Sequence, residues 1–131
     1  MTTNATCDIY IEHVSSHEAM PSDAQITAWA QTVLKALDIH IGAAIVFIDQ
    51  EEMTALNKQY RNKEGPTNVL SFPFEPPCGM VKETLGDVII CTDVVEEEAK
   101  AQAKTFQSHL AHMLTHSLLH LLGYDHQDDA Q

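Results

Sequence analysis

The chain has 131 residues, of which 44% are hydrophobic and 20% are charged. This length and composition are typical of one globular domain and exclude two independent enzymatic domains, so we expect a single domain over residues 1–131. Seven Lys and Arg residues against 19 Asp and Glu residues give a formal net charge of −12. Such an acidic surface repels polyanions over most of its area, which excludes a generally basic nucleic-acid-binding protein. Any contact with nucleic acid must therefore be local.

The cysteines and the hydropathy pattern indicate the cellular compartment. Cys7, Cys78 and Cys91 lie far apart, and none of them forms the C-x-x-C pair of a thiolate zinc site. No stretch approaches the ~20 apolar residues of a transmembrane helix, and the first residues lack the basic and apolar segments of a signal peptide. We therefore expect a cytoplasmic protein that makes no contact with membranes.

The hydrophobic pattern predicts strands interleaved with helices. Short alternating or β-branched apolar runs mark the strands, and apolar residues at three-to-four spacing mark the helices. The predicted strands cover residues 7–14, 42–49, 68–74 and 84–91. The predicted helices begin after an N-cap at Ser22, near Asp49, at Val94 and at Phe106, and they run to Leu37, Arg61, Lys104 and Leu122. This order, with helices at the end, favours an α+β fold with a small mixed β-sheet.

Certain residues are predicted to set the ends of these elements. Gly65 and Pro66 are expected to end the second helix. Thr92 or Asp93 is expected to cap the third helix. Pro73 cannot donate to a β-ladder, so its strand is expected to lie at an edge of the sheet or to end there.

The last predicted helix carries histidines at the spacing of a metal site. His116 and His120 are four residues apart, so both imidazoles lie on one side of the helix with one turn between them. Gly123 is expected to end the helix in a left-handed conformation, and a chain reversal there can return the ring of His126 to the pair. Three neutral imidazoles suit Zn²⁺ and leave one coordination position for water, which is typical of catalytic zinc. We therefore predict one zinc ion, bound by His116, His120 and His126.

The simpler interpretation is that these histidines are surface residues that bind no metal. Eight histidines occur in the chain, and five of them lie between His109 and His126, so the pair alone is weak support for a metal site. The third histidine beyond a helix-ending glycine is an independent requirement that favours the metal. His109 and His112 lie one or two turns earlier, and we expect packing or hydrogen bonding for them. Ser117 stands where zinc peptidases carry their general-base Glu, which disfavours peptide hydrolysis.

A second group of candidate residues is positively charged. Lys58, Arg61 and Lys63 place three of the seven cations within six positions. On so acidic a protein this segment is a candidate for phosphate binding, and the planar guanidinium of Arg61 suits a forked hold on a phosphate. A solvated helix end, where cations complement the helix dipole, accounts for the same cluster without a ligand.

Three segments resemble the signatures of the YbeY family of bacterial endoribonucleases. They are residues 67–73 (TNVLSFP), 85–88 (LGDV) and, most specifically, 116–126 (HSLLHLLGYDH). They follow the family's order over the C-terminal half of the chain, from Tyr60 onward. The resemblance implies a zincin-like α+β fold and a metal-dependent endoribonuclease specific for single-stranded RNA. It further implies action in maturation of the 3′ end of 16S rRNA and in late-stage ribosome quality control.

The resemblance also implies roles for individual residues. The residues that match by position are the zinc ligands His116, His120 and His126 and the functional arginine Arg61. We expect Lys63 and Ser71 to add contacts to the substrate phosphates. The family usually has Gly after its first metal-binding histidine, so Ser117 is a departure that adds a hydroxyl near the ion and removes no ligand.

Two other classes of function stay open from the sequence. A metal-stabilised ribosome-assembly or RNA-binding module that does not cut RNA is one, and the acidic surface favours basic ribosomal or ribosome-assembly proteins as its partners. A zinc hydrolase that acts on a small substrate is the other. DNA is not expected as a partner of any of them.

Overall fold

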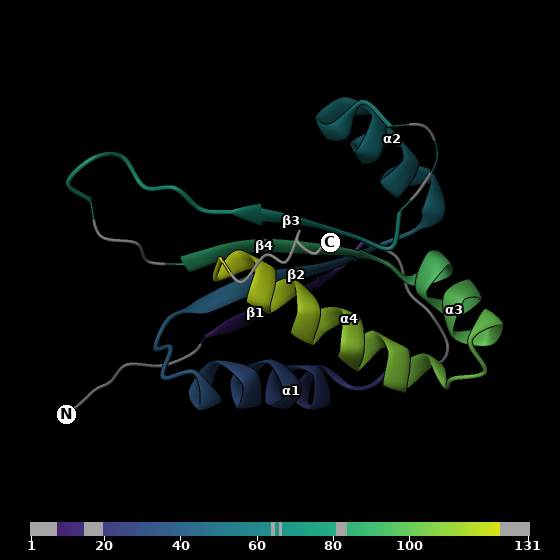
Figure 1. Cartoon of the computed structure of the whole chain (residues 1–131), viewed down its shortest axis with the longest axis horizontal. Helices are drawn as coiled ribbons and strands as arrows, with labels where there is room; N and C mark the ends of the chain where they lie inside the picture. The colour runs from purple at the N-terminus through teal and green to yellow at the C-terminus, as the bar shows by residue number, and fades with distance from the viewer. Residues whose placement is uncertain (1–7, 15–19, 64, 66, 81–83, 124–131) are drawn as a thin grey trace.

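A computed structural model describes residues 8–14, 20–63, 65, 67–80 and 84–123. Within these residues the chain forms four strands and four helices (Figure 1). The strands are β1 (Ile9–His13), β2 (Gly42–Ile48), β3 (Val69–Pro73) and β4 (Thr84–Cys91). The helices are α1 (Asp23–Ala36), α2 (Gln50–Arg61), α3 (Thr92–Ala101) and α4 (Phe106–Leu121). The α+β architecture expected from the sequence is confirmed.

The four strands form one mixed sheet in the order β1-β2-β4-β3. β1, β2 and β4 are parallel to one another, and β3 is antiparallel to β4. Pro73 is the last residue of β3, which is an edge strand. The prediction drawn from Pro73 is therefore confirmed, because an edge position costs the ladder no hydrogen bond.

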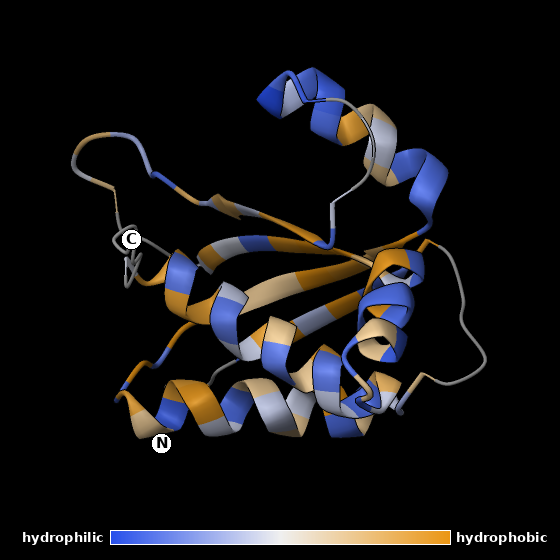
Figure 2. Cartoon of the chain, turned by 45° about the vertical axis from the view of Figure 1, so that its right-hand side comes forward, coloured by the Kyte–Doolittle hydropathy of each residue, from blue (hydrophilic) through white to orange (hydrophobic). Residues whose placement is uncertain are grey.

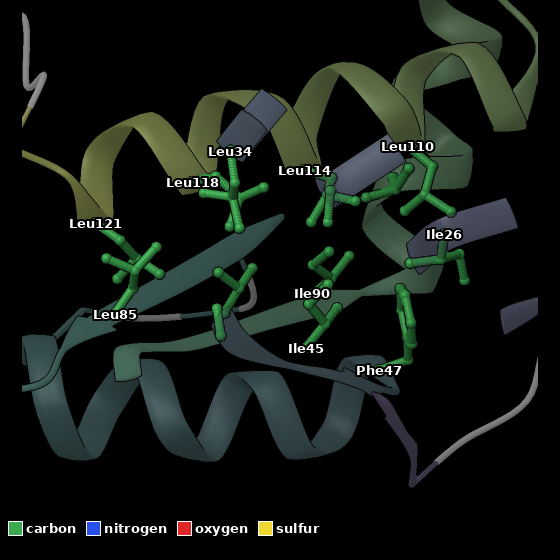
Figure 3. Close-up of a cluster of buried hydrophobic side chains, with 14 residues drawn as sticks. Ile26, Leu34, Ile45, Phe47, Leu85, Ile90, Leu110, Leu114, Leu118 and Leu121 are labelled. Atoms are coloured by element: carbon green, nitrogen blue, oxygen red, sulfur yellow. The ribbon is translucent and has the colours of Figure 1, made fainter. Parts of the chain in front are cut away.

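The larger hydrophobic core lies between the sheet and the helices α1 and α4, which cover the same face of the sheet (Figure 1). One row of α4 leucines recurs at helical spacing and is buried in this core. The row consists of Leu110, Leu114, Leu118 and Leu121. Figure 3 shows these side chains pointing from α4 towards Ile45, Leu85 and Ile90 of the sheet. Burial of this row fixes how α4 is rotated about its axis.

A smaller core lies on the opposite face of the sheet, under α2. Met53 of α2 is fully buried there, together with Ile48, Leu70 and Cys91 of the strands. Burial raises the pKa of the Cys91 thiol above its ordinary value, so this side chain is a neutral part of the core. Cys78 is exposed, and neither thiol forms a disulfide.

Hydropathy is unevenly divided among the helices (Figure 2). α4 alternates hydrophilic and hydrophobic bands along its length, whereas α2 is largely hydrophilic. The described part of the chain contains no helix that is long and apolar enough to cross a membrane.

Two of the helices begin where the sequence predicts, after the predicted N-cap at Ser22 and at the predicted helix start at Asp49. The Ser22 hydroxyl accepts a hydrogen bond from the Gln25 amide at 3.1 Å, and the Asp49 carboxylate accepts one from the Glu52 amide at 2.9 Å. Each cap satisfies an amide that has no partner within the helix. Leu37, which was expected to extend the apolar stripe of α1, instead follows the helix end and is exposed.

The predicted cap of α3 is wrong. The helix already begins at Thr92, and its N-cap position is Cys91, which makes no side-chain cap hydrogen bond. The Asp93 carboxylate accepts instead from the backbone amide of Gln50, at 2.9 Å, at the start of α2. This carboxylate therefore joins the first turns of two helices that are far apart in the sequence.

The predicted end of α2 is confirmed and that of α3 is wrong, and a residue other than glycine with a positive φ follows each helix. α2 ends at Arg61, as predicted, and Asn62, which follows it ahead of Gly65, has a φ of 55°. α3 ends at Ala101, and Ala103 has a φ of 57°, so the helix stops short of Lys104. The end of α4 agrees with the prediction, since Gly123 has a φ of 91°.

A close approach between β3 and β4 requires a glycine. Gly86 pairs with Pro73 and has a φ of 136°, which side chains disfavour. A Cβ added to Gly86 would lie 2.2 Å from the backbone oxygen of Phe72. Any larger residue here must push the edge strand away from the sheet.

We predict that Gly86→Ala lowers the free energy of unfolding by about 3 kcal/mol or more, because it combines an unfavourable φ with a backbone clash. Gly79→Ala is the matched control. Gly79 also has a positive φ, of 85°, but a Cβ there meets no atom within 4 Å, so its cost should be about 1–2 kcal/mol. Urea denaturation of both variants measures the difference. Equal losses would contradict the close approach of β3.

Candidate active-site cleft

A cleft of about 480 Å³ lies between α4 and the edge strand β3. α4 contributes Met113, His116, Ser117 and His120; the segment that enters and forms β3 contributes residues 67–71; and α2 contributes Arg61. These residues come from three separate parts of the chain. Four of the residues that the sequence singled out, Arg61, Ser71, His116 and His120, therefore line one cleft.

Both helical histidines reach the cleft because of the leucine row on α4. Residues three and four apart share a side of a helix. With the leucine row buried against the sheet, the adjacent stripe of α4 faces β3, and this stripe carries His116 and His120. His116 is exposed and His120 is half-buried. Two imidazoles one turn apart thus border a space that solvent enters.

The third predicted ligand, His126, lies outside the described residues. Among the residues that the structure describes, no three His, Cys, Asp or Glu side chains are grouped so that they can hold a metal ion. The donors at the cleft are the imidazoles of His116 and His120. Imidazole nitrogen is the ligand type that zinc takes from proteins, so the chemistry of this pair fits the predicted ion.

Ser117 lies at the floor of the cleft and does not offer a free hydroxyl to it. The side chain is buried, with 1% of its surface exposed, and its Oγ donates to the backbone oxygen of Met113 at 2.7 Å. This bond satisfies the hydroxyl within the helix. The departure from glycine at this position is therefore accommodated by the packing of α4.

Arg61 approaches the cleft from the side opposite α4. It is the last residue of α2, it is exposed, and it lines the cleft together with Ser71 of β3. The left-handed conformation of Asn62 turns the chain directly after it. Lys63 is exposed and is not part of the cleft lining. Its predicted contact with substrate stays a prediction.

Sequence reasoning missed a polar network beside the cleft. Asn68, which lines the cleft, donates from its side-chain nitrogen to both carboxylate oxygens of Glu98, at 3.1 and 3.3 Å. His109 contacts Glu98 Oε1 through Nε2 at 2.9 Å and is 2% exposed. The hydrogen bonding expected for His109 is thus confirmed. Its partner lies on another helix, and no local spacing in the sequence could have indicated it.

The remaining residues of interest lie away from the cleft. His112 is exposed, and its ring stacks on that of His109 with the centroids 6.3 Å apart. A smaller hollow of about 280 Å³ lies near β1 and is lined by residues that include Tyr10 and His40. Of the predicted site residues that the structure describes, none lines this hollow.

Comparison with known proteins gives one family. The sequence profile of the family described as Endoribonuclease YbeY matches residues 10–131. Two curated relatives with that name, from Coxiella burnetii strains Dugway 5J108-111 and RSA 331 / Henzerling II, are each 48% identical over 124 residues, which cover 92% of this chain and 82% of theirs. The solution structure of TM1509 from Thermotoga maritima superposes with a TM-score of 0.66 at 27% identity, over 93% of this chain and 77% of that one. The chain therefore belongs to the endoribonuclease YbeY family.

Proposed function

We propose that this protein is a zinc-dependent endoribonuclease that cuts single-stranded RNA. The observation that carries the proposal is the convergence of Arg61, Ser71 and two histidines on one cleft, in a chain that belongs to a family named for this activity. We assign to it the maturation of the 3′ end of 16S rRNA and a part in late-stage ribosome quality control, in the cytoplasm.

The size of the cleft supports a single-stranded substrate. A volume of about 480 Å³ is in the range of sites for small molecules. It accommodates a nucleotide unit of one strand rather than a duplex. The net charge of −12 favours a local contact with RNA, because phosphates are repelled except where a local cation such as Arg61 attracts them.

One zinc ion would be held by His116 and His120 of the cleft together with His126. A zinc ion supplies a Lewis acid that polarises a phosphoryl oxygen or activates a water molecule. The packing of α4 beside an edge strand supports a zincin-like classification of the fold. Ser117 is not required as a ligand, because its hydroxyl is bonded to the helix backbone.

The side chains of the chain itself bind and orient the phosphate. The Arg61 guanidinium can hold two phosphoryl oxygens at once and stabilise the charge that develops on them during cleavage. The Ser71 hydroxyl, from the lining of the same cleft, would donate to the same phosphate group. Lys63, outside the cleft, would attract the phosphates of the strand as it leaves.

The acidic surface supports basic proteins as additional partners. Nineteen acidic residues against seven basic ones attract ribosomal or ribosome-assembly proteins, and this charge favours the second candidate function, a module that binds ribosome precursors without cutting RNA. Cleavage assays with ribonuclease-free protein decide between the two functions.

We predict that Arg61→Ala lowers kcat/KM for single-stranded RNA by about 10²–10³-fold, the effect of removing one donor to a developing oxyanion, while zinc content stays unchanged. Arg61→Lys should recover only part of the activity, because an ammonium lacks the guanidinium fork. Lys35→Ala, which removes an exposed cation from the last turn of α1, is the control for net charge. Parallel loss of zinc and activity in Arg61→Ala would instead assign Arg61 a structural role.

Chelation of the metal should abolish cleavage, and added zinc should restore it. His116→Ala should lose both bound zinc and activity, because it removes an imidazole that borders the cleft. His112→Ala is the matched control, since it removes an exposed histidine of the same helix that does not line the cleft. Metal analysis and RNA cleavage are measured on the same preparations. Cleavage that resists the chelator would rule out the metal-dependent enzyme.

A further inference from the structure

The network behind the cleft fixes which end of the Asn68 amide the cleft presents. A carboxylate has no hydrogen to donate, so the Asn68 group that faces Glu98 at 3.1 and 3.3 Å must be its NH₂. The reversed amide would bring its oxygen against the carboxylate oxygens and replace two attractions with repulsion. The same nitrogen also lies 3.3 Å from Met113 Sδ, a weak acceptor. The amide nitrogen of Asn68 is therefore engaged by Glu98 and Met113.

The Asn68 oxygen is left as an accessible acceptor. No group in the described ranges donates to it. Asn68 is half-buried, and in the same ranges its oxygen is not among the fully buried side-chain atoms without a partner, which are Asn57 Oδ1 and His109 Nδ1. Because Asn68 lines the cleft, a molecule bound there meets this acceptor.

The network is held rigidly from both sides. His109, which is 2% exposed, contacts Glu98 Oε1 through Nε2 at 2.9 Å and so holds the carboxylate from below. The Asn68 backbone oxygen accepts from the Cys91 amide at 2.9 Å, which ties Asn68 to the end of β4. A carboxylate held by two hydrogen-bonding partners is a strong and directional anchor. The orientation of the Asn68 amide is thus set before any substrate binds.

The neighbours of Asn68 indicate which donor it accepts from. Met113, which contacts the Asn68 nitrogen, lies one helical turn before His116 and Ser117. Asn68 therefore lies about one helical turn, roughly 5.4 Å along α4, from the proposed zinc ligand His116, and it lines the same cleft as Arg61 and Ser71. The hydroxyl next to a phosphate in RNA is the ribose 2′-OH, which DNA lacks.

We infer that Asn68 distinguishes RNA from DNA by accepting a hydrogen bond from a ribose 2′-hydroxyl, and that Glu98 is the positioning residue that aims its oxygen. This inference rests on the proposed function and names the residue that selects the substrate sugar. Asn68 contributes to binding rather than to bond breaking, so its loss raises KM and leaves kcat unchanged.

The test combines protein variants with RNA oligonucleotides that each carry one 2′-deoxynucleotide, cut by the zinc-loaded full chain. With the unaltered protein, a deoxynucleotide directly on the 3′ side of the cleaved phosphate, whose 2′-hydroxyl cannot be the attacking group, should raise KM about three- to tenfold, the effect of one neutral hydrogen bond. Asn68→Ala should raise KM for all-ribose RNA by the same factor, and the deoxy substitution should then have no additional effect. Independent, multiplicative losses would overturn the inference, since they show two separate interactions.

Glu98→Gln tests the positioning role with nearly the same shape. A glutamine can donate as well as accept, so the Asn68 amide is free to turn its NH₂ into the cleft. The deoxy penalty should shrink, whereas Glu97→Gln, an exposed neighbour on α3, should leave it unchanged. A lower melting temperature with an unchanged deoxy penalty would make Glu98 merely structural and overturn its role. Failure of the unaltered protein to cut any RNA is a different result, which would refute the proposed function and this inference together.

Discussion

The fold and the site both depend on how the leucine row of α4 packs against the sheet. Leu110, Leu114, Leu118 and Leu121 are each at most 4% exposed, and burial of a leucine stabilises a fold by roughly 1.5–3 kcal/mol. This packing allows α4 only one rotation about its axis. The adjacent stripe, which carries both histidines, then necessarily faces the edge strand β3. The packing of these leucines therefore determines where the two histidines lie, although the leucines themselves take no part in the proposed reaction.

The opposite wall of the cleft is fixed by contacts between distant parts of the chain. Gly86 lets β3 lie close against β4, and the Asn68 amide is anchored through Glu98. The Asp93 carboxylate holds the first amide of α2, and the smaller core holds that helix against the sheet, so Arg61 at its far end reaches the cleft. Each contact adds a modest free energy, and together they bring side chains from three elements to one space.

The sequence predicted what depends on local pattern. Alternation and three-to-four spacing located the strands and helices of the described residues, and the caps at Ser22 and Asp49 follow from residue types that accept hydrogen bonds from helix amides. Contacts between residues far apart in the sequence could not be predicted from local pattern. Asp93 lies at a helix start and was expected to cap that helix, but its partner is 43 residues away. The contact between Asn68 and Glu98 spans 30 residues and leaves no trace in the spacing of the chain. The histidine pair at the cleft could be predicted, because two residues four apart on an α-helix lie on the same side of it.

In the proposed function, this cleft holds one zinc ion through three imidazoles. X-ray absorption spectroscopy at the zinc edge, on the full zinc-loaded chain, measures the number and type of ligands directly. We expect three imidazole nitrogens and one light-atom ligand at about 2.0–2.1 Å, with no sulfur contribution. A zinc–sulfur distance near 2.3 Å, or fewer than three imidazoles, would contradict this account.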